Sequence, residues 1–186
     1  MVTAQVVYDL HTLQNRFYLH GNTIASLQTS IPCLFPYLEA SGVDAVAFPD
    51  DGAAKRFKHM FDPAVYDIIV CGKVRDGDER RVTVQDGDVS GKTVVVVDDL
   101  VQTGGTLYEC GVALKGLGAI AVSAFVAHGV FPQKAWARFA KGGDRAVFDA
   151  FYLTNSIPTM TATLPEDDVF TVIDLTTQIV ADLDEL

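Results

Sequence analysis

Apolar runs alternate along this chain with segments of helical length. The strongest run, residues 93–97, has β-branched residues on both faces, which is typical of a strand covered on both sides in a parallel sheet. Strands separated by helices predict βαβ units and therefore an α/β fold with a doubly wound, mainly parallel sheet. The expected strands are 5–9, 45–48, 67–71, 81–85, 93–97, 120–127, 147–153 and 169–172, and the expected helices are 30–39, 52–60, 105–117, 131–140 and 176–183.

Local signals set several boundaries of these elements. Ser30, with Pro32 just inside, predicts the N-cap of the first helix, and Gly42 predicts its end. The residues after Cys71 are charged and predict a loop, and residues 86–88 predict a turn. Because no repeat or linker interrupts the pattern, we expect one domain over residues 1–186.

Composition limits the class of protein. A hydrophobic fraction of 49% and a charged fraction of 20% are enough for a folded core. No apolar run approaches the roughly 20 residues that cross a bilayer, and the first residues do not resemble a signal peptide. Cys33, Cys71 and Cys110 form no CxxC pair, so we expect three reduced, buried thiols in a cytoplasmic protein, with an organelle left open.

Charge is distributed unevenly. A net charge of −10 argues against a sequence-independent nucleic-acid partner. Lys and Arg residues gather between 55 and 92, whereas the chain after residue 165 carries acids without a base. This pattern fits either a local anion site on an acidic protein or a solvated loop followed by an acidic tail.

The most informative segment is residues 94–106, in which a buried strand ends in Asp98 and Asp99 and a glycine-containing loop then opens a helix. Ligands bind beyond the carboxyl ends of strands in open α/β sheets, and a helix N-terminus attracts anions. A phosphate site beside two carboxylates that can accept from a diol predicts ribose 5-phosphate. The segment has neither a P-loop nor a GxGxxG motif. The alternative is an Asp N-cap followed by a glycine turn.

This segment resembles the PRPP-binding loop that type I phosphoribosyltransferases share with PRPP synthetases (ribose-phosphate pyrophosphokinases). The resemblance implies a type I phosphoribosyltransferase-like fold in which Asp98 and Asp99 hold the ribose 2- and 3-hydroxyls. It assigns the 5-phosphate to five loop residues, Gln102, Thr103, Gly104, Gly105 and Thr106.

Three other segments resemble the synthetases in particular, and most closely their plant-type second class. Residues 7–17 resemble the Asp-Leu-His segment, which implies that His11 is a ligand of magnesium–ATP. Residues 71–75 resemble the start of the catalytic flexible loop and imply that Lys73 and Arg75 are catalytic. Residues 48–57 resemble the pyrophosphate loop, with Asp50 also associated with the metal; the implied pyrophosphate-binding residues are Asp50, Asp51, Gly52, Ala53 and Lys55.

The residues by themselves leave other interpretations open. His11 alone fits a hydrogen-bonded or capping histidine, and Asp50 alone fits a helix cap as well as a ligand of Mg²⁺. Lys73 and Arg75 alternate along an extended chain and can point to one side, although such a pair is usually solvated. His128 follows a predicted strand end and fits either the site or a structural role.

The resemblance implies a diphosphokinase that transfers diphosphate from Mg–ATP to the 1-hydroxyl of ribose 5-phosphate, giving PRPP and AMP for nucleotide biosynthesis. The expected cofactor is Mg²⁺, and the expected partners are ribose 5-phosphate and ATP, without nucleic acid or membrane. The resemblance also implies a homo-oligomer. It covers only the second synthetase domain and the segment before it, so the N-terminal domain is expected to be absent or supplied by a separate synthetase half. A phosphoribosyltransferase that uses PRPP and a non-catalytic subunit associated with a synthetase are the alternatives.

Overall fold

The structure is a computed structural model that describes residues 3–19, 21–76, 79–166 and 168–185. The strands and α-helices are β1 Thr3–Tyr8, β2 Thr23–Gln28, α1 Phe35–Ala40, β3 Ala45–Phe48, α2 Asp51–Phe57, β4 Asp67–Asp76, β5 Glu79–Asp86, β6 Thr93–Val101, α3 Gly105–Gly116, β7 Ala121–Gly129, β8 Phe151–Thr154, α4 Pro158–Thr161, β9 Phe170–Ile173 and α5 Thr176–Asp184. Short 3₁₀ segments lie at Leu13–Tyr18, Ile31–Cys33, Lys58–Met60 and Pro132–Arg138.

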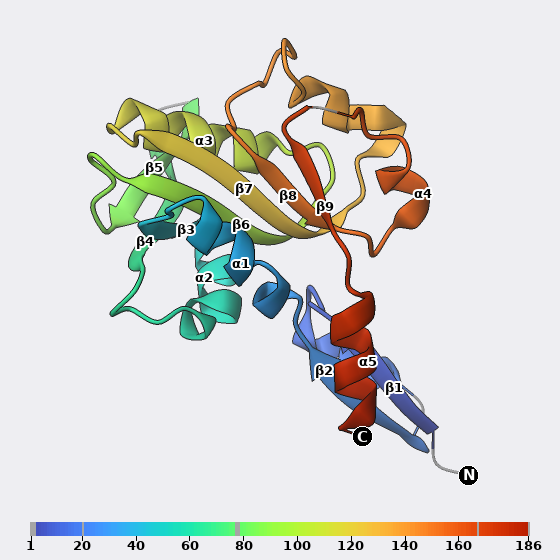
Figure 1. Cartoon of the computed structure of the whole chain (residues 1–186). Coiled ribbons are helices and arrows are strands. Elements are labelled where there is room, and N and C mark those ends of the chain that lie inside the picture. Colours follow the sequence, from blue (N-terminus) through green and yellow to red (C-terminus); the bar gives the residue numbers. More distant parts are fainter. Residues whose placement is uncertain (1–2, 20, 77–78, 167, 186) are drawn as a thin grey trace.

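The main sheet has the strand order β5-β4-β3-β6-β7-β8-β9. All neighbours are parallel except β4 and β5, which form an antiparallel pair at one edge. Helix α3 covers one face of this sheet, and α1 and α2 cover the other (Figure 1). The predicted α/β fold with a doubly wound, mainly parallel sheet is confirmed.

Strand β6 joins the two layers of the core, because its side chains alternate between the faces of the sheet. Val94 and Val96 pack with Leu107, Cys110 and Leu114 of α3. Val95 and Val97 pack on the other face, in the cluster that contains Phe48 and Phe57. The four valines have no exposed surface, as expected for a central parallel strand.

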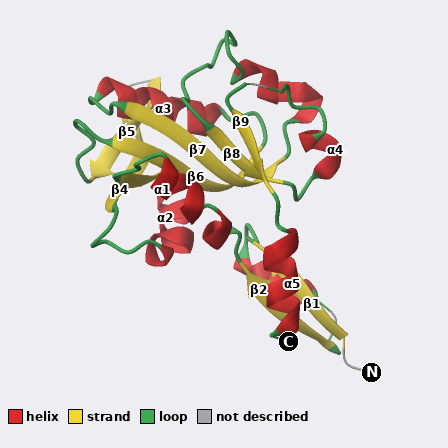
Figure 2. Cartoon of the chain, in the orientation of Figure 1, coloured by secondary structure: helices red, strands yellow, loops and turns green. Residues whose placement is uncertain are grey.

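The chain termini form a second, smaller unit, which we call the small lobe: β1, the 3₁₀ segment Leu13–Tyr18, β2 and α5. Strands β1 and β2 pair in parallel and are separate from the main sheet. In Figures 1 and 2 the two strands and α5 project together from one end of the main sheet. The Tyr8 hydroxyl donates to Asp182 and connects β1 with α5.

Several boundaries differ from the sequence prediction. Strand β2 and helix α4 were not predicted, β8 is shorter than expected, and the segment 131–140 is an irregular 3₁₀ turn with positive φ at Phe131, Gln133 and Lys134. The charged segment after Cys71 is not a loop, because β4 continues to Asp76 and pairs with β5.

Ser30 occupies the N-cap position of the 3₁₀ segment Ile31–Cys33 but makes no capping hydrogen bond with its side chain, and one of the three cysteines is not buried. The Ser30 hydroxyl donates to Asp9 at 2.5 Å, so it ties β1 to the main body and does not cap a helix. Cys71 and Cys110 are buried free thiols whose sulfurs lie 3.4 Å apart, whereas Cys33 is only half-buried. Every helix in the described part of the chain is too short or too polar to cross a bilayer.

The tight packing of α3 on the core leads to a first prediction. A Cβ added at Gly111 would lie 2.9 Å from Phe148 Cε1 and 3.1 Å from Val147 Cγ1, whereas Gly116 of the same helix has open space. We expect Gly111→Ala to lower the free energy of unfolding by about 1–3 kcal/mol through overpacking. Gly116→Ala should raise it by roughly 0.5–1 kcal/mol, because alanine favours the helix. Urea denaturation measures both, and a stabilising Gly111→Ala would contradict the packing described.

Candidate functional site

The loop between β6 and α3 requires glycine where it turns into the helix. Gly104 has φ 68° and ψ 20°, in the left-handed region, and it directly precedes the first residue of α3. A Cβ at this position would also lie 2.4 Å from Phe139 Cζ. Phe139 is itself fully buried, so the aromatic core sets how closely the loop approaches it. The free N–H groups at the start of α3 therefore face the cavity described next.

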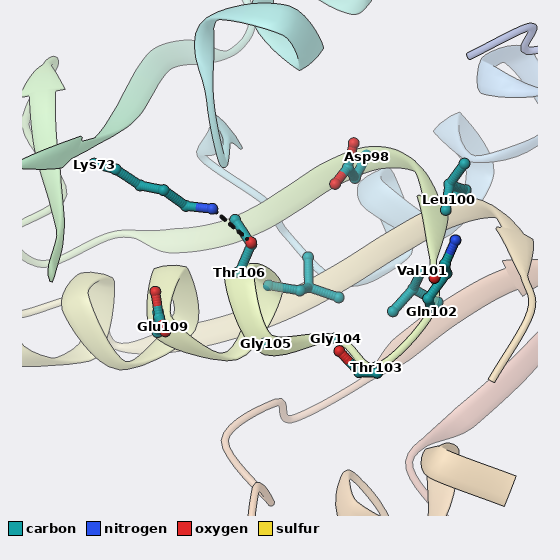
Figure 3. Close-up of a pocket in the computed structure, with 11 residues that line it drawn as sticks. Lys73, Asp98, Leu100, Val101, Gln102, Thr103, Gly104, Gly105, Thr106 and Glu109 are labelled. Carbon is teal, nitrogen blue, oxygen red and sulfur yellow. Dashed lines mark hydrogen bonds between the residues drawn. The ribbon is translucent and has the colours of Figure 1, made fainter. Parts of the chain in front are cut away.

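A cavity of about 420 Å³ opens above this loop (Figure 3). Its walls are Lys73, Asp98, residues 100–107 and Glu109. Lys73 reaches across from β4 and donates from Nζ to Thr106 Oγ1 at 2.9 Å. The cavity thus contains all five residues predicted for the 5-phosphate, together with the predicted catalytic lysine. A cation, hydroxyl groups and a helix N-terminus around one cavity form an anion site.

The carboxylates of Asp98 and Asp99 lie in different environments. Asp98 lies at the cavity wall, with its side chain 21% exposed, and its Oδ1 accepts from the Asp99 backbone N–H at 2.9 Å. The Asp99 side chain is only 2% exposed and does not line the cavity. Successive side chains of a strand point to opposite faces, which explains the separation. Asp98 of the pair therefore borders the cavity, and the prediction that both aspartates hold the ribose hydroxyls stays a prediction.

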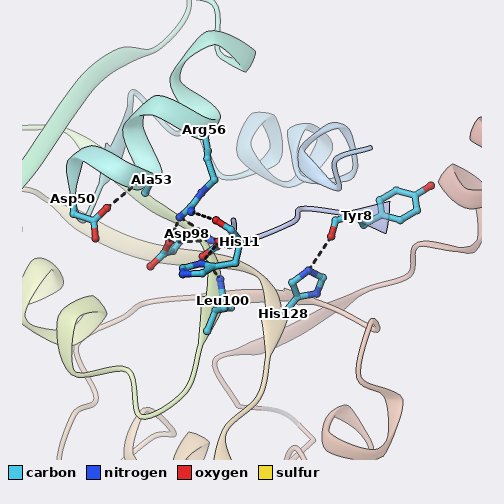
Figure 4. Close-up of polar contacts among 9 residues, drawn as sticks. Tyr8, His11, Asp50, Ala53, Arg56, Asp98, Leu100 and His128 are labelled. Atoms are coloured by element: carbon cyan, nitrogen blue, oxygen red, sulfur yellow. Dashed lines mark hydrogen bonds and ion pairs between the residues drawn. The ribbon is translucent and has the colours of Figure 1, made fainter. Parts of the chain in front are cut away.

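Asp99 instead forms the centre of a group that we call the Asp99 cluster: Asp99, His11 and Arg56 (Figure 4). Its Oδ2 lies 2.6 Å from His11 Nδ1 and 3.2 Å from Arg56 Nη2. Its Oδ1 accepts from the Leu100 backbone N–H at 2.7 Å. Arg56 also donates from Nη1 to the His11 carbonyl at 2.7 Å. One buried carboxylate therefore connects β6, α2 and the segment after β1.

Sequence reasoning missed Arg56 and chose its neighbour Lys55. Lys55 is exposed and lines a separate apolar cavity between α2 and β2. It therefore lies away from the cavity above the loop between β6 and α3. Arg56 lies one position further round the helix and turns its guanidinium toward Asp98 and Asp99. Its Nε is buried without a hydrogen-bond partner. Helical periodicity could have found it, since Ala53 and Phe57 mark the buried face of α2 beside it.

The pKa of Asp98 is raised to about 7. Burial is the largest cause, and the negative charges of Asp99 and Asp50 add to it. The backbone N–H of Asp99 acts in the opposite direction by stabilising the carboxylate. Asp98 therefore gains or loses a proton near neutral pH, and a nearby cation would favour its ionised form.

The N-terminus of α2 holds the other residues predicted for pyrophosphate. Asp50 is the N-cap, with Oδ1 accepting from the Ala53 backbone N–H at 2.9 Å. Asp51 and Gly52 form the exposed first turn. Strand β3, which leads into this turn, pairs with β6, so the turn lies beside the strand end that carries Asp98. The cap interpretation of Asp50 is confirmed, and its other oxygen has no hydrogen bond within the described part of the chain.

The predicted catalytic and metal residues are only partly assembled. Lys73 meets the cavity, whereas the side chain of Arg75, in the same strand, lies outside the described residues. His11, with a side chain 60% exposed, contacts Asp99 and not Asp50. Among the described residues, no group of three His, Cys, Asp or Glu side chains could hold a metal ion by itself.

His128 lies at the far side of the same rim. It stands near the end of β7, in register with Leu100 of β6. Its Nε2 lies 3.1 Å from the Tyr8 carbonyl (Figure 4). Its Nδ1 lies 2.9 Å from Ser156 Oγ. His128 therefore contacts the small lobe and does not line the cavity above the loop between β6 and α3.

Comparison with known proteins agrees with this geometry. Ribose-phosphate pyrophosphokinase 4 of Arabidopsis thaliana is 44% identical over 93% of this chain and 52% of its own length. The mitochondrial ribose-phosphate pyrophosphokinase 3 of Spinacia oleracea is 42% identical over 97% of this chain and 46% of its own length. The chain spans about half the length of these curated relatives.

A solved structure extends the likeness beyond the main sheet. The phosphoribosylpyrophosphate synthetase of Mycobacterium smegmatis matches 97% of this chain and 57% of its own, with a TM-score of 0.72 and 26% identity. The matched part therefore includes the small lobe as well as the sheet. The phosphoribosyl transferase domain family matches residues 45–147, which contain β3 to β7, α2, α3 and the cavity. The chain belongs to the phosphoribosyl transferase domain family.

Proposed function

We propose that this chain provides the ribose 5-phosphate site and the transfer site of a ribose-phosphate diphosphokinase. The reaction moves the β,γ-diphosphoryl group of ATP to the 1-hydroxyl of ribose 5-phosphate and releases AMP. The observation that carries the proposal is the cavity at the start of α3, with Lys73 from β4 reaching across it to Thr106. The relatives, which are ribose-phosphate pyrophosphokinases, support the same reaction.

The sugar phosphate is bound mainly by the loop after β6. The 5-phosphate lies against the N-terminus of α3, where the backbone N–H groups of residues 103–106 and the hydroxyls of Thr103 and Thr106 donate to it. Asp98 accepts from a ribose hydroxyl, as its place on the cavity wall allows. Asp99 acts indirectly in this proposal, because its carboxylate already binds His11 and Arg56.

The nucleotide phosphates approach from the side of α2 and the small lobe. Asp50, Asp51, Gly52 and Ala53 present the first turn of α2 to the pyrophosphate. Lys73, with Arg75 on the same strand, neutralises charge on the transferring diphosphoryl group. No general base is assigned, because positioning and electrostatic stabilisation supply most of the catalysis in phosphoryl transfer.

The donor set suits a magnesium ion that arrives with the nucleotide. Mg²⁺ usually binds one or two protein carboxylates and takes its other ligands from phosphates and water. Burial is the largest cause of the raised pKa of Asp98, and the negative charges of Asp99 and Asp50 add to it; a divalent cation at this rim would offset those charges. Asp50, through its free oxygen, and His11 are the residues we propose to hold it. When bound, the ion supplies charge neutralisation for the phosphates.

The proposal also covers the surroundings of the enzyme. We propose ribose 5-phosphate and ATP as small-molecule partners and a homo-oligomeric assembly. The relatives include proteins named as mitochondrial and as chloroplastic, so the proposal extends to the cytoplasm and to organelles alike. Because the relatives are about twice as long, activity is best assayed both with the chain alone and with a separate synthetase half added.

The reaction and the role of Lys73 are tested together. PRPP and AMP should form from Mg–ATP only when ribose 5-phosphate is present. Lys73→Ala should lower kcat by about 10²–10³, because it removes a cation from the transferring group. The ribose 5-phosphate dissociation constant, measured by calorimetry, should change much less. Lys115→Ala is the matched control, since Lys115 of α3 pairs with Asp149 away from the cavity.

Three results would reject parts of this assignment. Unchanged turnover in Lys73→Ala removes Lys73 from the catalytic site. Pyrophosphate release that depends on PRPP and a purine or pyrimidine base would establish a phosphoribosyltransferase instead. If the chain is inactive with and without a synthetase half yet binds ribose 5-phosphate, it is a non-catalytic sugar-phosphate-binding subunit.

The raised pKa of Asp98 predicts a pH-dependent stability. Between about pH 4 and pH 7 the native chain retains a proton that the unfolded chain has lost, so stability contributed by this group falls as pH rises through this window. Asp98→Asn removes the cost of ionisation. We expect it to raise the free energy of unfolding by on the order of 1–2 kcal/mol at pH 8, and to have little effect at pH 4.

Urea denaturation at several pH values measures this effect. Asp184→Asn changes an exposed carboxylate at the end of α5 and serves as the control, with an expected change below about 0.5 kcal/mol at every pH. If Asp98→Asn shifts stability equally at pH 4 and pH 8, the carboxylate does not titrate near neutrality.

A further inference from the structure

His128 connects the main sheet to the small lobe near the candidate site. Tyr8 is the last residue of β1, and its carbonyl is 3.1 Å from His128 Nε2. The Tyr8 hydroxyl is held separately by Asp182 of α5. Three residues after Tyr8, His11 meets Asp99. The His128 contact therefore lies between the rigid main sheet and the segment that carries the histidine of the Asp99 cluster.

The direction of this hydrogen bond does not depend on the charge of His128. A carbonyl can only accept, so Nε2 carries the proton and donates to Tyr8. On the other side of the ring, Nδ1 either accepts from the Ser156 hydroxyl or, in the charged form, donates to it. Ser156 Oγ can in turn donate to the Ala127 carbonyl at 3.1 Å. Both forms of the ring keep the contact with Tyr8.

The backbone beyond Tyr8 has few conformations open to it. Asp9 has φ 46°, in the left-handed region, which is uncommon for a residue other than glycine although aspartate is one of the residues that adopt it more often. Its carboxylate accepts from Thr29 Oγ1 at 2.7 Å and from the Ser30 backbone N–H at 2.8 Å, which fixes the turn. With this turn rigid, the position of the Tyr8 carbonyl determines where His11 lies relative to β6.

We propose that His128 is a positioning residue for His11, acting through its Nε2 hydrogen bond to the Tyr8 carbonyl. It holds the end of β1 so that the His11 imidazole reaches Asp99 and its other face meets the nucleotide phosphates. Only the second part of this statement rests on the proposed function. The effect of His128 on the order of residues 9–19 does not depend on it.

Two substitutions separate the two nitrogen atoms of the ring. The amide nitrogen of glutamine extends as far as Nε2, so His128→Gln keeps a donor for Tyr8. The amide nitrogen of asparagine extends only as far as Nδ1, so His128→Asn can reach Ser156 and not Tyr8. Ser156→Ala is the control, because it removes the Nδ1 partner and leaves the Nε2 contact in place.

Hydrogen exchange followed by mass spectrometry gives the first readout. In His128→Asn, we expect the amides of residues 9–19 to exchange about three- to tenfold faster than in the wild type, as for loss of one hydrogen bond. The amides of 94–97 in β6 should be unchanged. In His128→Gln and Ser156→Ala the exchange rates of residues 9–19 should stay within about twofold of the wild type, since both variants keep the donor to the Tyr8 carbonyl.

Kinetics give the second readout in any preparation that makes PRPP. The KM for Mg–ATP should rise about three- to tenfold in His128→Asn and recover in His128→Gln, with the ribose 5-phosphate dissociation constant unchanged in both. If residues 9–19 exchange alike in His128→Asn and wild type, or if His128→Gln exchanges as fast as His128→Asn, the inference is wrong. Faster exchange throughout β6 would also overturn it, by showing a general loss of stability. If the wild type makes no PRPP, the proposed function fails while the exchange comparison still decides the role of His128.

Discussion

The arrangement of this site depends on the buried carboxylate of Asp99. A carboxylate removed from water is stable only when it is paired and hydrogen-bonded. Asp99 meets this requirement with the Arg56 guanidinium, the His11 imidazole and the Leu100 backbone N–H. These partners come from α2, from the segment after β1 and from the end of β6 itself. Satisfying one buried charge therefore brings together three segments that are far apart in the sequence.

The need to pair the buried carboxylate of Asp99 also explains why the two neighbouring aspartates differ. Because side chains alternate along β6, only one of them can face the cavity when the other is buried. Asp99 takes the buried position and receives the cations, whereas Asp98 stays at the wall with Arg56 Nη2 at 3.8 Å. The charge of Asp98 is offset less by Arg56, so burial and the negative charges of Asp99 and Asp50 raise the pKa of Asp98. A buried structural carboxylate and a titratable carboxylate at the cavity wall are thus produced by adjacent residues of one strand.

The sequence predicted the parts of the site that depend on local structure. The valine run, Gly104 and the start of α3 can be read from residue types alone, since a buried strand, a left-handed turn and a helix N-terminus each have local signals. The choice between Lys55 and Arg56 needs the helical periodicity of α2 as well as the residue types. Their difference depends on how α2 rotates over the sheet, and that rotation is set by the packing of Ala53 and Phe57.

The charged segment after Cys71 was missed for a different reason. It becomes a strand because β5, which begins at Glu79, supplies its hydrogen bonds, and Val82 of β5 joins the same core cluster as Cys71. Ser30 has the residue type and position of a helix cap, and yet its hydroxyl donates to Asp9, 21 residues earlier. The first case is a pairing between consecutive strands, whereas Ser30 finds its partner in a segment far from it in the sequence. A local cap signal at Ser30 cannot anticipate that partner.

The small lobe shows what this long-range support means for function. Parallel sheets are normally covered on both faces, and a pair of strands alone is marginal in water. Strands β1 and β2 nevertheless carry His11, which the Asp99 cluster requires. Their order must therefore come from outside the pair, through α5 at Asp182, through Ser30 at Asp9, through β7 of the main sheet at His128 and through α2 at Arg56. Because His128 binds the Tyr8 carbonyl and Arg56 binds the carbonyl of His11 itself, the position of His11 is set by the contacts between the small lobe and the main body.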